Sequence, residues 1–133
     1  MYRYGKEMTK EELDKLITIL EAEIPAICEK LVDLNSKYNV LSEEIRNITD
    51  ERKKEGKLGG MWGEYFEKLR KFIGPQQILQ DGIRSNIYEE ERKLATYKFA
   101  LQTALNVNQN GSGKVLIYAL NVLYKVKRKL LSR

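Results

Sequence analysis

Apolar residues between Leu13 and Ile48 recur at alternating steps of four and three positions, without a change of phase. This heptad spacing predicts one long helix with a coiled-coil-type stripe along one side. Thr9 and Glu12 form a capping-box pattern, and Met8 with Leu13 fits a hydrophobic staple, so we expect the helix to begin at residue 9 or 10. The stripe consists of Leu13, Ile17, Leu20, Ile24, Ile27, Leu31, Leu34, Tyr38, Leu41, Ile45 and Ile48.

Two features bear on the continuity of this first helix. Pro25 lacks a backbone donor and clashes with the carbonyl four residues earlier, so a kink or a break is expected there. Residues 35–39 are poor helix formers, and Ser42 could cap a new helix. Because the heptad phase does not change, the pattern favours one kinked helix over two shorter ones. The basic residues 52–54 and Gly56 favour an end near residue 55.

Residues 55–74 form a connector that is rich in glycine and aromatic residues. Within it, residues 64–73 can form a short amphipathic helix, which Gly74 and Pro75 are expected to end. A second long helix then runs from about Pro75 to Val107, again with stripe positions at steps of four and three. These positions are Ile83, Ile87, Glu90, Leu94, Tyr97, Leu101 and Ala104.

The C-terminal part of the chain begins with a flexible loop at residues 108–113. The pattern of residues 114–133 then predicts a last helix. Its first turns are apolar nearly all round, and its end is basic. Alternating apolar residues in the same segment also fit a strand, which remains a weaker alternative.

Together these elements predict an all-α fold in a single domain. Residues 1–8 form an N-terminal arm, and residues 9–107 form a long antiparallel hairpin of coiled-coil type, in which residues 9–55 pack against residues 75–107. The connector with its short helix lies at the tip, and the basic C-terminal helix packs alongside. The first helix is longer than the second, so the last helix or another subunit must cover the surplus stripe. We therefore expect a homo-oligomer, most simply a symmetric dimer.

Glu90 occupies a stripe position of the second helix where an apolar residue is expected. A buried polar group in such a stripe often fixes the register of a helix pair. In the predicted hairpin Glu90 lies opposite residues 38–41, so Tyr38 or Lys37 is the expected partner.

Candidate catalytic and metal-binding chemistry is sparse. The chain has no histidine and a single cysteine, Cys28, so it has no internal disulfide, no zinc site and no activated nucleophile. Residues 111–114, Gly-Ser-Gly-Lys, lack the first glycine and the following serine or threonine of a phosphate-binding loop. The consecutive glutamates at 89–91 would point in different directions on a helix. We therefore expect no catalytic, cofactor-binding or metal-binding residue, and a protein that is not an enzyme.

Charge is unevenly distributed along the chain, whose net charge is +5. No acidic residue follows Glu91 but nine of the 24 basic residues do, so the last 42 residues carry +9 and the first 91 carry −4. Basic side chains with aromatic neighbours suit RNA or single-stranded DNA. Alternatively, the charges favour a helix C-terminus, dock on the acidic part of this chain or a second copy, or meet an anionic membrane surface. The candidate nucleic-acid-binding residues are Lys114, Tyr118, Tyr124, Lys125, Lys127, Arg128, Lys129 and Arg133.

Trp62 lies in the connector with Tyr65 and Phe66 nearby, and a lone tryptophan in such a place is often the anchor for a protein partner. The alternative is that Trp62 folds back onto the end of the hairpin. The sequence thus predicts a non-enzymatic helical binding, scaffold or inhibitor protein that uses protein–protein contacts and self-association, with accessory nucleic-acid binding as the alternative. With neither a signal-peptide pattern nor a transmembrane run of roughly 20 apolar residues, we expect a cytoplasmic protein.

Overall fold

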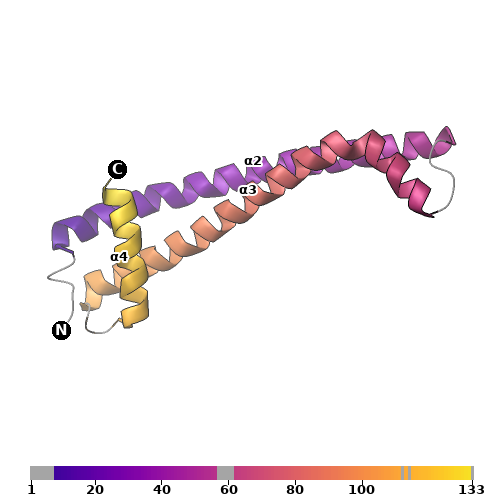
Figure 1. The fold of residues 1–133 in the computed structure, drawn as a ribbon. Helices are drawn as coiled ribbons and strands as arrows, with labels where there is room; N and C mark the ends of the chain where they lie inside the picture. Colours follow the sequence, from indigo (N-terminus) through magenta and orange to yellow (C-terminus); the bar gives the residue numbers. More distant parts are fainter. Residues whose placement is uncertain (1–7, 57–61, 112, 114, 133) are drawn as a thin grey trace. The chain divides into compact units, whose positions relative to one another are not determined.

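A computed structural model describes residues 8–56, 62–111, 113 and 115–132, with side chains described for all of these except 62–66. It contains the helices α2 (Lys10–Lys54), α3 (Trp62–Asn110) and α4 (Ile117–Leu131), shown in Figure 1. The described residues contain no strand, so the all-α prediction is confirmed and the strand alternative for the C-terminal segment is wrong.

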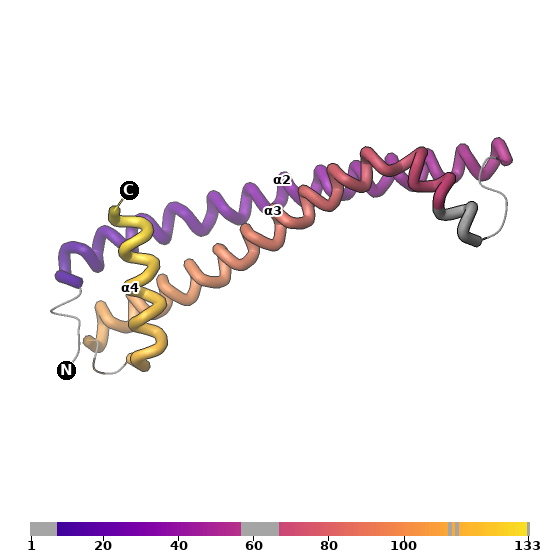
Figure 2. Tube along the Cα trace, viewed as in Figure 1, coloured from indigo at the N-terminus to yellow at the C-terminus, as the bar shows by residue number. Residues whose placement is uncertain are grey.

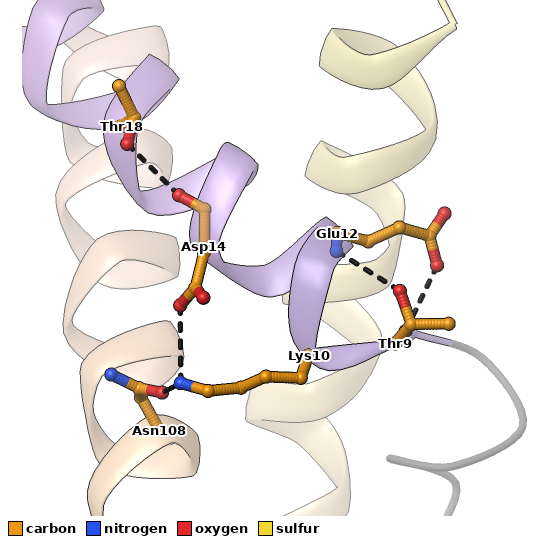
Figure 3. A network of polar contacts seen from close by, with 6 residues as sticks. All are labelled: Thr9, Lys10, Glu12, Asp14, Thr18 and Asn108. Carbon is orange, nitrogen blue, oxygen red and sulfur yellow. Dashed lines mark hydrogen bonds and ion pairs between the residues drawn. The ribbon is translucent and has the colours of Figure 1, made fainter.

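Helix α2 begins as the capping-box pattern predicts. The backbone N–H of Thr9 donates to Oε1 of Glu12 at 3.0 Å, and the backbone N–H of Glu12 donates to Oγ1 of Thr9 at 3.1 Å (Figure 3). These two bonds satisfy donors that a helix N-terminus leaves without intrahelical partners. Met8 and Leu13 are both buried, as a hydrophobic staple requires.

Pro25 lies inside α2 and does not break it. Pro25 and Glu21 are both exposed, so solvent can hydrogen-bond the Glu21 carbonyl that loses its helical donor. The favoured prediction of one helix over two shorter ones is therefore confirmed, and the kink expected at Pro25 stays a prediction. Every residue of the predicted stripe on α2 is buried or half-buried, which is what holds the helix across the proline.

Helix α3 continues through Gly74 and Pro75, so the predicted stop at these residues is wrong. The separate short helix expected at 64–73 is the first part of α3, which bends in this region without ending (Figure 2). Ile73 is buried and Phe72 is half-buried, and this packing outweighs the hydrogen bond lost at the proline. The connection between the long helices is consequently shorter than the expected connector of residues 55–74.

The chain divides into two compact units, and each is described by itself. The three-helix unit comprises residues 1–30 and 90–133, and α4 lies there against the first part of α2 and the last part of α3 (Figure 1). All three helices contribute to its core, because α4 covers apolar side chains that two helices would leave open. The buried apolar residues are Met8, Leu13, Leu16, Leu20, Ile27, Tyr97, Ala100, Ala104, Val107, Ala119, Leu120, Leu123, Tyr124, Val126 and Leu130.

The two-helix unit comprises residues 31–89, where α2 and α3 form an antiparallel pair. Among its described apolar side chains only Leu34 and Ile73 are buried, because a helix pair can cover just one side of each helix. The register is marked by a hydrogen bond of 2.6 Å from Nε2 of Gln80 to Oγ of Ser42. Near the turn, the guanidinium of Arg52 lies 4.6 Å from the ring centroid of Phe72.

Candidate interaction surfaces

Glu90 is buried in the three-helix unit, with 6% of its surface exposed, and two lysines neutralise it. Its Oε2 lies 3.3 Å from Nζ of Lys30 on α2 and 3.6 Å from Nζ of Lys93 on α3. The prediction that Glu90 pairs with Tyr38 or Lys37 is therefore wrong. Helix α3 begins at Trp62 and not near Pro75, and this earlier start shifts the register so that Glu90 meets Lys30.

Tyr38 instead contacts a positively charged side chain of α3 within the two-helix unit, that of Arg84. The guanidinium of Arg84 lies 5.4 Å from the ring centroid of Tyr38 and donates to its hydroxyl. Together with the Ser42–Gln80 hydrogen bond, this contact joins the two helices along one flank. Both pairs fix the register of α2 against α3 along the helix axes inside this unit.

The other flank of the two-helix unit carries an apolar groove of about 340 Å³. Val40 and Leu79 lie on it and remain 63% and 61% exposed. Neither residue belongs to the predicted stripes, and the sequence pattern alone does not predict a functional role for either. The signal was nevertheless present, because each is a large apolar residue placed off the buried side of a helix. The groove is lined by Ser36, Lys37, Val40, Leu41, Leu79 and Ile83.

Charged residues of α2 border this groove. Nζ of Lys37 lies 3.0 Å from Oδ2 of Asp33, one turn earlier on the same helix. Glu44 is exposed one turn beyond Val40, and it has no ion-pair partner within the described ranges. A lysine and a glutamate thus flank the apolar centre on either side along α2.

Helix α4 separates its apolar and basic residues onto two faces. The apolar face packs into the three-helix unit, whereas Tyr118, Lys125, Arg128 and Lys129 are exposed. Lys125 follows Tyr118 by seven positions, and Arg128 and Lys129 follow Lys125 by three and four. These spacings keep all four residues on one side of the helix. We call these four residues the basic face of α4. It brings together half of the candidates for nucleic-acid contacts.

Two of the remaining candidates for nucleic-acid contacts, Tyr124 and Lys127, are described and do not belong to this face. Tyr124 is buried, so its ring packs in the core and not against solvent. Nζ of Lys127 lies 3.4 Å from Oε2 of Glu12 and its side chain is only 20% exposed. Lys114 and Arg133 lie outside the described residues.

The Lys127–Glu12 ion pair joins α4 to the N-terminal cap of α2 inside the three-helix unit. The pKa of the Glu12 carboxyl is lowered from 4.5, first by the hydrogen bond from the backbone N–H of Thr9 and then by the charge of Lys127. One basic residue of the C-terminal run therefore docks on the acidic part of this same chain. Nearby, Nζ of Lys10 lies 3.2 Å from Asp14 and donates to Asn108 of α3 (Figure 3).

The predicted anchor for a protein partner falls at the start of α3. The backbone of Trp62, Tyr65 and Phe66 is helical, but their side chains lie outside the described part of the structure. Their role stays a prediction. Within the three-helix unit, the ring centroid of Phe99 lies 5.9 Å from that of Tyr118.

The described part of the chain contains neither a cluster of metal ligands nor a membrane-spanning helix. No three His, Cys, Asp or Glu side chains in these parts of the chain gather as metal ligands would. None of the described helices is long and apolar enough to cross a membrane. Comparison of the whole chain with protein-family models, curated proteins and solved structures finds no match.

Proposed function

We propose that this chain is a non-enzymatic helical binding protein that acts through protein–protein contacts at the groove of its two-helix unit. The observation that supports the proposal is the exposure of Val40 and Leu79, 63% and 61%, on a groove with an apolar floor. Groups of exposed apolar side chains rimmed by polar residues are typical of protein interaction sites. The exposed thiol of Cys28 is consistent with a reducing compartment such as the cytoplasm.

The energetics favour a protein partner at this groove. Fully burying an exposed valine or leucine side chain contributes roughly 1.5–3 kcal/mol. Two such residues from each partner, with the half-exposed Leu41 and Ile83 around them, supply the apolar centre that a stable interface needs. The charged residues Lys37 and Glu44 then form a polar rim.

A photo-cross-linking amino acid placed at single positions in the full chain, inside the cell, tests the proposal. Leu79 lies on the groove, and Tyr88 is a matched control because it is 65% exposed on the same helix. The two residues are nine positions apart, which places them on opposite sides of α3. We expect a discrete cross-linked protein product from position 79 and none from position 88. Equal products from both positions, or none from either, would contradict the proposal.

Nucleic-acid binding is a second candidate function, favoured by the basic face of α4. Lys125, Arg128 and Lys129 are exposed together, and the exposed ring of Tyr118 could stack on a base. If these three residues contact phosphates, log K should fall with log salt at a slope of about −2 for a single strand. Fluorescence anisotropy with an RNA and a single-stranded DNA oligomer at several salt concentrations measures this slope. Replacing the three residues by alanine should abolish it, and wild-type protein that binds neither oligomer at low salt would exclude this function.

A further inference from the structure

We propose that the occupant of the groove is a second copy of this chain, related by a two-fold axis perpendicular to the helices. The axis passes between Val40 and Leu41 on α2 and beside Asp81 on α3, so that each helix packs antiparallel on its own copy. This inference rests on the proposed function, because it names the partner that the groove binds. All the residues that it uses lie within the two-helix unit.

The charges along α2 complement themselves about this axis. Lys37 and Glu44 are equally far from the point between Val40 and Leu41, so Lys37 of each copy faces Glu44 of the other. Glu44 has no ion-pair partner within the described residues of its own chain. Lys37 uses one contact on Asp33, at 3.0 Å, and its ammonium group has further donors. A symmetric interface requires this reciprocity, since the same patch is used on both copies.

The apolar residues of α3 obey the same symmetry. Leu79 and Ile83 are equally far from Asp81, so Leu79 of each copy meets Ile83 of the other. Farther out along α3, Gln76 and Asn86 are also equally far from Asp81, and both are neutral amides. No like charges therefore oppose each other along α3.

The centre of symmetry on α2 lies between Val40 and Leu41, and that on α3 lies at Asp81. The hydrogen bond of 2.6 Å between Gln80 and Ser42 places these two centres at the same level along the helix pair. Ser42 is adjacent to Leu41, and Gln80 is adjacent to Asp81. One axis can therefore pass through the centre of symmetry on both helices. A helix pair in a different register would have separated them.

The self-complementary pattern favours a second copy over other occupants. An unrelated protein partner would not require that Lys37 and Glu44 lie symmetrically about an apolar centre. A nucleic acid would need cations along the groove, whereas Val40, Leu41, Leu79 and Ile83 give it an apolar floor.

Charge reversal tests the axis directly in the purified full chain. Each of Lys37→Glu and Glu44→Lys puts like charges opposite each other twice per dimer, so we expect each to weaken the dimer about tenfold or more. The double variant restores both pairs and should return the dissociation constant to near the wild-type value. Sedimentation velocity over a range of protein concentrations measures these constants, and circular dichroism verifies that helix content is unchanged.

A matched control pair is available on the same helix. Glu43 and Arg46 form an exposed ion pair that does not line the groove. Reversing each of them should leave the dissociation constant unchanged, although the net charge changes by the same amount as in the test variants. Control reversals that weaken the dimer as much as the test reversals would overturn the proposed axis.

Other outcomes separate this inference from the proposed function. If the chain stays monomeric at all concentrations, the proposal that a second copy occupies the groove is wrong. The same holds if Lys37→Glu and Glu44→Lys leave the dissociation constant of the dimer unchanged. If position 79 still cross-links a protein of different mass, the groove is a binding site and only the partner was wrong. If position 79 yields no specific product as well, the proposed function fails with the inference.

Discussion

The two units differ in whether a third helix covers the apolar residues that lie off the main stripe. In the three-helix unit, to which α4 adds a third helix, Leu16 is off the stripe and fully buried. In the two-helix unit Val40 is also off the stripe but lies exposed on the groove. Both residues lie on α2 and off the same stripe, so we attribute the difference to the number of helices in each unit. Stability should therefore reside in the first unit and association in the second.

The largest expected effect is the loss of a core side chain from α4. Leu123 is buried in the three-helix unit, and Leu123→Ala should lower the free energy of unfolding by about 2–5 kcal/mol because it leaves a cavity. Chemical denaturation followed by circular dichroism measures the change. A loss below about 1 kcal/mol would mean that α4 is only loosely packed and that the contrast between the units is wrong.

The next effect concerns the buried carboxylate of the three-helix unit. The double substitution Lys30→Met and Lys93→Met leaves Glu90 buried without a cation and should cost about 3 kcal/mol. Adding Glu90→Leu removes the unpaired charge and should recover most of that loss. The same denaturation assay compares the two proteins. If Glu90→Leu recovers nothing, the carboxylate was already solvated.

The N-terminal cap of α2 should contribute less. Thr9→Ala removes the hydroxyl that accepts from the backbone N–H of Glu12, and a lost cap of this kind costs about 1 kcal/mol. Thr18→Ala is a suitable control, because the hydroxyl of Thr18 donates to the carbonyl of Asp14 within the helix and caps no helix end. Thermal unfolding should show a lower midpoint for Thr9→Ala than for the control, and equal midpoints would refute the contribution of the cap.

The pH dependence of Glu12 should be a smaller effect, since its side chain is partly exposed. Its folded pKa lies below 4.5, so the stabilisation that it contributes is fully present above pH 4.5 and is lost as the pH falls through the lowered value. The gap in unfolding free energy between wild type and Glu12→Gln should therefore be constant near neutral pH and close in acid. A gap that widens in acid would have the wrong sign for a lowered pKa.

The smallest effect on stability is expected in the two-helix unit. Leu79 is exposed, so Leu79→Ser should change the unfolding free energy of the monomer by no more than about 0.5 kcal/mol. The measurement requires protein dilute enough to be monomeric. A loss as large as that of Leu123→Ala would show that Leu79 belongs to a core, and the two units would then not differ as described.

Local patterns predicted the parts of the fold that depend on neighbouring residues. The capping box at Thr9 and Glu12 is formed, and the heptad stripes lie on the covered sides of α2 and α3. The error at Gly74 and Pro75 has a different origin. Whether a helix continues past a proline depends on how the residues on either side of the proline pack. Here the buried side chain of Ile73 stabilises the helix, and sequence rules for neighbouring residues do not include such packing.

That error determined what the sequence missed at the candidate sites. A turn placed too late in the chain put Glu90 opposite the wrong part of α2, so Lys30 was not recognised as its partner. The basic face of α4 was predicted in part, since Lys125, Arg128 and Lys129 are exposed as expected. The burial of Tyr124 could not be foreseen, because it depends on which side of α4 meets the other helices.

The pairing of Lys127 with Glu12 has a consequence for the order in which the chain folds. The two-helix unit is one continuous segment, residues 31–89, whereas the three-helix unit needs residues from before 31 and after 89. A ribosome therefore releases the whole two-helix unit well before α4 exists to complete the core of the three-helix unit. During that interval the apolar side of early α2 is open, and slow closure of such distant contacts favours aggregation. We expect the groove to be available to a second nascent chain before the core of the first chain is complete.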